Sequence, residues 1–236
     1  MLLKPEEEGM ENSTWIKTST TIKLHEPIAI VGSPGLRSIG KLAVDSLISQ
    51  TESDLVAELY STHFPSIYQT IPAYAAHPSL PGMGGTIVDA GNIDFPKVQF
   101  YACPSPCLIL VRGYHPNFEG QYEVAEKVVD YLSENGVKKM IVIAGFGTRE
   151  RKIVCAANNQ EAIDELKEKF GVGIGYKGPF MGFSGLVFGL AKLKSIDATC
   201  LFSGAEAKED DIESPDKEAS DRAVDLINKM LGFSKP

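Results

Sequence analysis

Short apolar runs alternate with amphipathic stretches along most of this 236-residue chain, and this alternation constrains its fold more than any other feature of the sequence. Mainly apolar runs at residues 27–31, 107–111 and 139–144 are typical of strands buried on both faces of a sheet. Residues 39–49 and 118–135 space their apolar side chains as a helix with one buried face does. The alternation therefore predicts an α/β fold whose sheet is covered by helices on both faces.

The same two periodicities place the remaining elements. Further strands are expected at 20–24, 54–60, 153–157 and 198–203. Further helices are expected at 159–170, 182–194 and 215–231. Residues 86–89 and 97–101 flank Gly91-Asn92 and are expected to form a hairpin-like pair. The segment 61–85 and the acidic segment 208–215 are expected to be irregular.

Composition and charge restrict the environment of the chain. It carries 23 Lys and Arg against 31 Asp and Glu, a net charge of −8, which disfavours nucleic acid and anionic membranes as partners. No apolar stretch reaches the ~20 residues of a membrane span, and the N-terminus does not resemble a secretory signal, so a cytoplasmic protein is predicted. Residues 1–25 are polar and are expected to form a mobile lead-in to a single α/β domain over 26–236.

The cysteines and histidines point away from metal chemistry. The cysteines are Cys103, Cys107, Cys155 and Cys200, and no second pair or nearby histidine completes a zinc site around the first two. Buried structural thiols are expected instead. The four histidines lie in or beside loops without metal-ligand spacing, and the sequence therefore predicts no metal and no cofactor.

The turn between the strand at 27–31 and the next helix is the strongest candidate for ligand binding. In α/β folds, backbone N–H groups at such a helix start bind anions. Residues 35–41 match the first part of a P-loop, but Leu42 stands where that motif needs Ser or Thr to hold magnesium, so a tight packing turn is favoured over ATP hydrolysis. If a phosphate or carboxylate binds here, a second turn after the strand at 139–144 is expected to converge on the same sheet edge. The candidate ligand-binding residues are Gly32, Pro34, Gly35, Arg37, Gly40, Lys41, Gly145, Gly147 and Thr148.

No set of side chains in the sequence makes a convincing catalytic centre. The segment Gly182-Phe-Ser-Gly185 has only part of the Gly-x-Ser-x-Gly pattern of a nucleophile elbow. The helix over 182–194 is apolar nearly all round, which suits a core helix first and a subunit contact second.

Taken in order, several short motifs resemble the archaeal and bacterial branch of the proteasome assembly chaperone family. The matching segments span nearly the whole chain: 27–35 with 39–43, 57–61 with Phe64-Pro65, 145–148, 155–161, Gly178-Pro179 with 182–186, and 215–219. The resemblance implies a three-layer α/β/α sandwich with a mixed, mainly parallel sheet of the phosphorylase/hydrolase-like kind.

The resemblance also implies a role. It suggests a non-enzymatic binding protein that forms homo-oligomers and acts as a chaperone or adaptor on proteasome α-subunits. Some relatives dock through a C-terminal tail with a penultimate tyrosine, whereas this chain ends Phe233-Ser-Lys-Pro236 and lacks that residue. Two alternatives stay open: an enzyme or sensor that binds a small phosphate or carboxylate at the glycine turn, and a structural subunit of another assembly.

Overall fold

The computed structural model of the chain describes residues 13–20, 22–64, 86–175, 177–206 and 214–233. Its strands are β1 (Thr14–Thr18), β2 (Ile28–Gly32), β3 (Asp54–Ser61), β4 (Ile87–Asp89), β5 (Asn92–Asp94), β6 (Val98–Cys103), β7 (Leu108–Arg112), β8 (Lys139–Gly147), β9 (Ile153–Ala157), β10 (Gly173–Ile174) and β11 (Asp197–Ala205). Its helices are η1 (Leu36–Ser38), α1 (Ile39–Gln50), α2 (Gln121–Glu134), α3 (Gln160–Phe170), α4 (Gly182–Leu193) and α5 (Lys217–Leu231). Every helix within these ranges is too short or too polar to span a bilayer.

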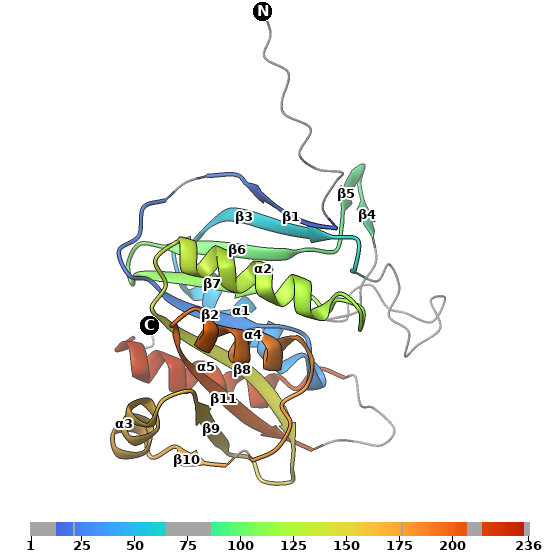
Figure 1. The fold of residues 1–236 in the computed structure, drawn as a ribbon. Helices are drawn as coiled ribbons and strands as arrows, with labels where there is room; N and C mark the ends of the chain where they lie inside the picture. The colour runs from blue at the N-terminus through green and yellow to red at the C-terminus, as the bar shows by residue number, and fades with distance from the viewer. Residues whose placement is uncertain (1–12, 21, 65–85, 176, 207–213, 234–236) are drawn as a thin grey trace, which may run out of the picture.

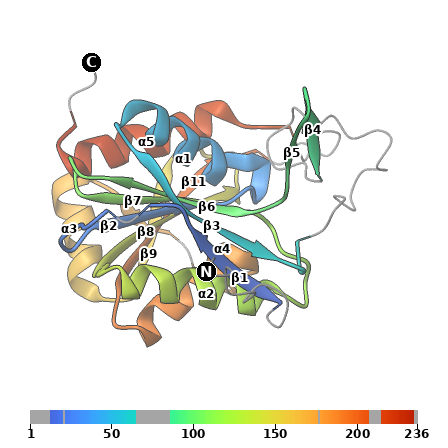
Figure 2. The same ribbon diagram turned by 90° about the horizontal axis from the view of Figure 1, so that it is seen from above.

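Nine of the described strands form one mixed sheet in the order β1-β3-β6-β7-β2-β8-β11-β9-β10 (Figure 1). The four central strands, β7, β2, β8 and β11, are parallel, while the strands outside them pair antiparallel except for β10 with β9. Helices α1 and α5 lie on one face of the sheet and α2 and α4 on the other (Figure 2). The predicted three-layer sandwich with a mixed sheet is confirmed.

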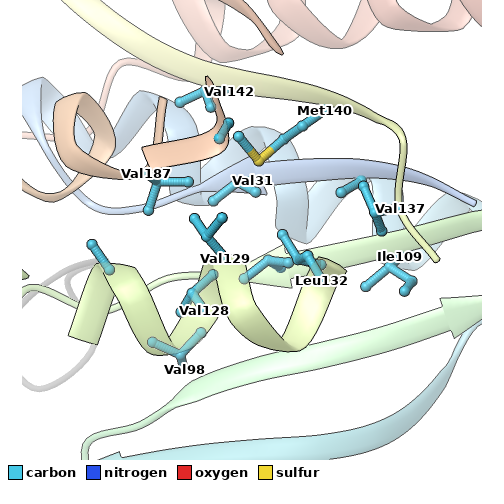
Figure 3. Packing of buried hydrophobic residues seen from close by; sticks show 14 of the residues in the cluster. Val31, Val98, Ile109, Val128, Val129, Leu132, Val137, Met140, Val142 and Val187 are labelled. Atoms are coloured by element: carbon cyan, nitrogen blue, oxygen red, sulfur yellow. The ribbon is translucent and has the colours of Figure 1, made fainter. Parts of the chain in front are cut away.

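The core is divided by the sheet into two apolar clusters, because successive residues of a strand face opposite sides. In β2, Val31 faces the cluster under α2 and α4, whereas Ile30 faces the cluster under α1 and α5. Figure 3 shows the first cluster, where Val128, Val129 and Leu132 of α2 pack toward the sheet. Uninterrupted apolar runs were the sequence signature of these strands because both of their faces are buried.

Helix ends follow the chemistry of their capping residues. The Asn159 side chain accepts a hydrogen bond from the backbone N–H of Ala162 (2.8 Å) and begins α3, and Gly171 ends that helix in the left-handed conformation. The Asp216 side chain accepts from the backbone N–H of Ala219 (2.9 Å) and begins α5 in the same way. Local chemistry therefore determines where these helices start and stop.

The first strand of the sheet lies at Thr14–Thr18, so the predicted strand at Thr20–Leu24 is wrong. Strand β1 pairs antiparallel with β3, and Trp15 stands opposite Tyr60 with the two rings stacked. The ladder ends where the backbone N–H groups of Ser19 and Thr20 both donate to the carbonyl of Val56. Part of the predicted lead-in is therefore an edge strand of the main sheet, while residues 1–12 lie outside the described ranges.

The predicted partner in the hairpin around Gly91 is also wrong. Ile87–Asp89 pairs with Asn92–Asp94 across a turn at Ala90 and Gly91, which both have positive φ. Such a two-residue turn requires the strands to pair immediately beside it. Strand β6, over the expected partner 97–101, pairs instead with β3 and β7. Of the segments expected to be irregular, 61–85 and 208–215, only 61–64 and 214–215 are described, and Ser61 is the last residue of β3.

Candidate functional site

The predicted ligand-binding residues lie at the carboxyl ends of the adjacent parallel strands β2 and β8. The chain leaves β2 toward α1 on one face of the sheet and leaves β7, on the other side of β2, toward α2 on the opposite face (Figure 2). This divergence of neighbouring connections is where open α/β sheets form a crevice. The packing of residues at this position therefore indicates whether the turn leaves space for a ligand or is filled by the protein itself.

Backbone packing fills much of this position. A Cβ added to Gly40 would stand 2.6 Å from the carbonyl oxygen of Ile143, and one added to Gly32 would stand 2.0 Å from the carbonyl oxygen of Gly40. The backbone N–H of Lys41 donates to the carbonyl of Ser33 at 3.0 Å, which closes the turn onto the helix start. Gly32 and Gly40 are thus required by the close approach of β2, α1 and β8, which agrees with the packing interpretation.

The turn itself has an unusual backbone. Gly35 has φ 55° and ψ −156°, a conformation that is essentially restricted to glycine. Arg37 and Ser38 follow with φ of 49° and 53°, both left-handed although neither is glycine. Each such residue costs roughly 1–2 kcal/mol relative to a right-handed one. The preceding Pro34 is buried. The positive φ values of Arg37 and Ser38 show that the turn adopts a conformation that its own sequence does not favour.

Arg37 supplies the contacts that hold this turn. Its guanidinium bonds the carboxylate of Asp216 at 2.9 Å and the carbonyl oxygens of Ser214 and Glu206 at 2.9 and 3.2 Å. The Asp216 backbone N–H donates back to the Arg37 carbonyl at 3.0 Å. Arg37 is 8% exposed. This side chain therefore joins the β2–α1 turn to the end of β11 and the start of α5.

Lys41 is also held by a carboxylate. Its Nζ lies 2.7 Å from Asp45, one turn further along α1, and the same carboxylate accepts a bond from Arg112 at the end of β7. Arg112 in turn donates to the side-chain oxygen of Gln99 at 3.0 Å. Both cationic side chains of the predicted anion site thus bond carboxylates of the protein itself.

The second predicted turn meets the first where the two parallel strands end side by side. A Cβ added to Gly145 would stand 2.7 Å from Ile39 and 3.0 Å from the carbonyl oxygen of Leu36, so this glycine lies against the first turn. Gly147 is exposed with open space beside it. The Thr148 backbone N–H donates to the carbonyl of Ala205 at 2.9 Å, which joins it to the end of β11. Gly145 therefore belongs to the packed turn, while Gly147 and Thr148 lie beyond it.

Three polar side chains at this edge were not among the sequence candidates. The His115 Nε2 accepts a hydrogen bond from the backbone N–H of Gly35 at 2.6 Å, and the hydroxyls of Ser33 and Ser184 lie 2.9 Å apart. Burial lowers the pKa of the His115 imidazole, which favours the neutral ring that such an acceptor requires. The available signal was position, because His115 follows β7 just as Gly35 follows β2.

Three of the four cysteines are buried, as expected, and Cys107 is not. Cys103, Cys155 and Cys200 are buried and Cys107 is half-buried, and all four are free thiols. Burial raises the pKa of the Cys103, Cys155 and Cys200 thiols, which disfavours the reactive thiolate. Among the described residues, no three His, Cys, Asp or Glu side chains gather closely enough to hold a metal ion.

The fold and this edge together define a class: an α/β/α protein whose glycine turn is packed and braced rather than left open. A family model described as the PAC2 family matches residues 29–236, and the chain belongs to that family. The predicted relationship to proteasome assembly chaperones is thereby confirmed at the level of the family.

Comparison with individual proteins agrees with this assignment. The uncharacterized protein MJ1210 of Methanocaldococcus jannaschii is 28% identical over 185 residues, which are 75% of this chain and 65% of that protein. Pyrococcus furiosus PbaB, an archaeal proteasome activator, has a TM-score of 0.77 at 24% identity, covering 95% of this chain and 91% of that one. Pyrococcus furiosus PbaA, an archaeal homolog of proteasome-assembly chaperone, has a TM-score of 0.70 at 21% identity, covering 94% and 88%. These structures share the fold of this chain over nearly its whole length.

Proposed function

We propose that this chain is a non-enzymatic, homo-oligomeric binding protein of the cytoplasm. In this proposal it serves as a proteasome assembly chaperone or adaptor that contacts proteasome α-subunits. The observation that supports the proposal most is the agreement in fold with PbaB and PbaA over at least 94% of the chain. Because fold alone does not determine function, the proposal also needs a surface on which a partner can bind.

Helices α2 and α4 offer such a surface. Helix α4 buries Phe183, Val187 and Leu190 against the sheet, but Leu193, its last residue, is 73% exposed. At the starts of α4 and α2, Met181 is 80% exposed and Phe118 is 89% exposed. A contiguous patch of exposed apolar side chains is typical of a surface that binds another protein, and this proposal takes these three residues as parts of one patch. We therefore assign both self-association and partner binding to this α2–α4 surface.

Binding through the α2–α4 surface would not require a C-terminal tail. Phe233 packs against the core beside α5, and residues 234–236, where some relatives carry a docking tyrosine and this chain does not, lie outside the described residues. The absence of that tyrosine from the sequence therefore does not count against contact through the body of the protein.

Native mass spectrometry of the chain mixed with its cognate proteasome α-subunits tests the proposal. We expect a complex with the unchanged chain and its loss in the double variant Met181→Asp, Leu193→Asp. The matched control is Ile174→Asp, which changes a 60% exposed apolar residue on β10 at the end of the sheet. Failure to form a complex at any ionic strength would contradict the chaperone role.

Self-association is measured separately by light scattering on the chain alone. We expect an oligomer that dissociates in the Leu193→Asp variant, because burying an unpaired carboxylate at an apolar contact is strongly unfavourable. A monomer at all concentrations would contradict the homo-oligomer, but it would not contradict contact with α-subunits, which native mass spectrometry measures in a separate experiment.

Binding of a phosphate or carboxylate at the glycine turn is the second candidate, and its geometry is less favourable. Arg37 and Lys41, the cations that would hold the anion, already bond Asp216 and Asp45. A thermal-shift screen with nucleotides and sugar phosphates tests it, since a ligand at 100 times its dissociation constant stabilises a protein by about 2.7 kcal/mol. A shift that disappears in Lys41→Ala would favour this function over the first.

A further inference from the structure

A second region of the protein, at the β1 edge of the sheet, has the features of a binding groove. A cavity of about 650 Å³ opens beside β1, β3 and the segment that enters β6. Its lining residues are Trp15, Lys17, Tyr60, Ser61, Phe64, Thr86, Phe95 and Pro96. Four aromatic rings and a proline are a composition that favours apolar side chains of a bound peptide. This aromatic groove is separate from the glycine turn, and a ligand bound in it would be additional to the proposed function.

The wall of the aromatic groove is held rigidly. The Trp15 and Tyr60 rings stack with centroids 5.9 Å apart, and the Tyr60 hydroxyl donates to Glu58 at 2.9 Å. Lys97 bonds Glu58 and Asp94, both at 2.6 Å, and its Nζ lies 5.9 Å from the centre of the Tyr60 ring. A wall that is already ordered loses little conformational entropy when a ligand binds.

Lys17 is the charged residue of the lining, and it stands two residues from Trp15 on the same face of β1. Its neighbour across the strand pair is Glu58, but that carboxylate is bonded to Lys97 and Tyr60. No ion pair joins Lys17 to a residue within the described ranges. An exposed ammonium at the edge of an aromatic groove favours a ligand that carries a negative group.

The outer edge of β1 supplies hydrogen-bonding groups. Toward β3, the carbonyl of Ser13 accepts from Thr62 and the backbone N–H of Ser19 donates to Val56, each at 2.8 Å. Because an antiparallel ladder alternates, the backbone groups of Thr14, Ile16 and Thr18 point away from β3. Thr14 is only 5% exposed, so the accessible part of this edge runs from Ile16 to Thr18. No strand of the described ranges pairs with that side of β1. An edge of this kind binds an extended peptide as an additional strand.

We propose that this groove binds the carboxyl-terminal segment of an extended peptide. The peptide adds as a strand along the outer edge of β1, its last apolar side chain lies between the aromatic rings, and its terminal carboxylate pairs with Lys17. The strand edge selects a peptide over a small aromatic acid, because backbone hydrogen bonds along β1 require a chain of several residues. Lys17 selects a free carboxylate over an amidated end.

The chain carries its own reporter for this proposal, because Trp15 is its single tryptophan. The experiment titrates the full chain with two acetylated valine-rich octapeptides that end in phenylalanine, one with a free carboxylate and one amidated. We expect the carboxylate peptide to shift the emission of Trp15 to shorter wavelength and to saturate. The amidated peptide is expected to bind about three- to five-fold more weakly, since an exposed ion pair contributes that much.

Two variants and their controls complete the test. Lys17→Gln should remove the preference for the carboxylate peptide, while Lys167→Gln on α3 should keep it. Phe95→Ala should weaken both peptides about ten-fold, while Ile174→Ala should not; both of these residues are more than half exposed, so each variant is expected to fold.

Several outcomes would overturn the proposal. These are an unchanged Trp15 emission, equal affinity for the two peptides, or a Lys17→Gln variant that keeps the preference. Binding of N-acetylphenylalanine as tight as that of the octapeptide would assign the groove to a small aromatic acid instead. An emission that changes with protein concentration in the absence of peptide would assign it to a second copy of this chain. None of these outcomes depends on proteasome α-subunits.

Discussion

The glycine turn after β2 and the aromatic groove beside β1 differ in how their charges are used. In the turn, Arg37 and Lys41 are bonded to Asp216 and Asp45, and the backbone of β8 packs against Gly40. In the groove, Lys17 is exposed beside a rigid aromatic wall and an unpaired strand edge of the described sheet. The turn resembles a ligand motif in sequence, but its cations are bonded to carboxylates of the protein, whereas the groove has no motif and its lysine is exposed.

The partners of Arg37 and Lys41 within the protein make the motif a weaker indication of a binding site at this turn. The sequence Gly40-Lys41 is the same whether the lysine ammonium binds the phosphate of a ligand or pairs with a carboxylate one helical turn away. Substitutions can test whether the turn has a structural role and whether the walls of the groove are ordered, and the largest expected effect on stability comes first.

The largest effect is expected for Arg37→Ala. The substitution removes three hydrogen bonds from a guanidinium that is 8% exposed and leaves Asp216 without its cation. Breaking a buried pair in this way costs about 3–5 kcal/mol, so urea unfolding should show a loss in that range. Lys41→Ala is the control, because a surface ion pair contributes about 1 kcal/mol or less. Equal losses in the two variants would contradict a structural role specific to Arg37.

The second prediction compares two helical glycines. Gly40→Ala forces a Cβ toward the Ile143 carbonyl, 2.6 Å away, and should destabilise the protein by about 1–3 kcal/mol. Gly189→Ala, on the exposed side of α4 with open space around it, should stabilise it by about 0.5–1 kcal/mol. Thermal unfolding of both variants measures the two signs. A neutral Gly40→Ala would show that the turn has spare room for a ligand.

The third prediction concerns the rigidity of the aromatic groove. Desolvation opposes ionisation of Glu58, but hydrogen bonds from Lys97 and Tyr60 outweigh it and lower the pKa of that carboxyl. Lys97→Met removes the cation and should cost about 1–3 kcal/mol at pH 7, because the Glu58 carboxylate is left largely buried without it. Acrylamide should then quench Trp15 more strongly. Unchanged quenching would mean that the network does not order the groove.

The pH dependence of that variant provides a second measurement. A carboxyl whose pKa is lower in the folded state stabilises the protein above its unfolded value and loses this contribution as the pH falls through the folded value. The contribution of Glu58 is therefore present at pH 7, begins to decline below about pH 4.5, and is lost as the pH falls through the lower folded value. Lys97→Met should reduce the difference in stability between pH 7 and pH 4. The variant Lys167→Met should leave that difference unchanged.

The smallest effect is expected for His115. Burial lowers the pKa of this imidazole, so the folded state binds a proton less readily than the unfolded state. The stability present at neutral pH should fall as the pH drops through about 6.5 toward the folded value. His115→Gln should reduce the difference in melting temperature between pH 7.5 and pH 5.5. A difference as large as in the unchanged chain would mean that His115 does not titrate against folding.

Much of the fold was predictable because buried strands and helices have characteristic local patterns of apolar residues in the sequence. The apolar runs of β2, β7 and β8 are continuous because both faces of these strands are covered, and Asn159 and Gly171 mark the ends of α3 by their own chemistry. Strand β1 was harder to predict, since Lys17 and Thr18 are exposed and only Ile16 packs on the apolar core, while pairing with β3 supplies its hydrogen bonds. Edge strands of this kind are therefore difficult to predict from sequence.

The sequence predicted where the two turns of the candidate site lie, but it did not predict which of their side chains are bonded within the protein. Parallel strands end at one edge, so Gly35 and Gly145 could be placed together from the order of elements alone. That Arg37 would reach Asp216, 179 residues away, depends on the path of α5 across the sheet. The aromatic groove was missed for a similar reason, because Trp15, Tyr60 and Phe95 come from three separate segments.

The sequence by itself determined the layered α/β architecture, the capped helices and the membership of the PAC2 family, because these depend on periodicity and on short motifs in a fixed order. Only the tertiary structure decided which lysine is paired and which is exposed, and which glycine lies against a neighbouring strand. Those properties depend on distances between residues remote in the chain, and local sequence carries no record of such distances.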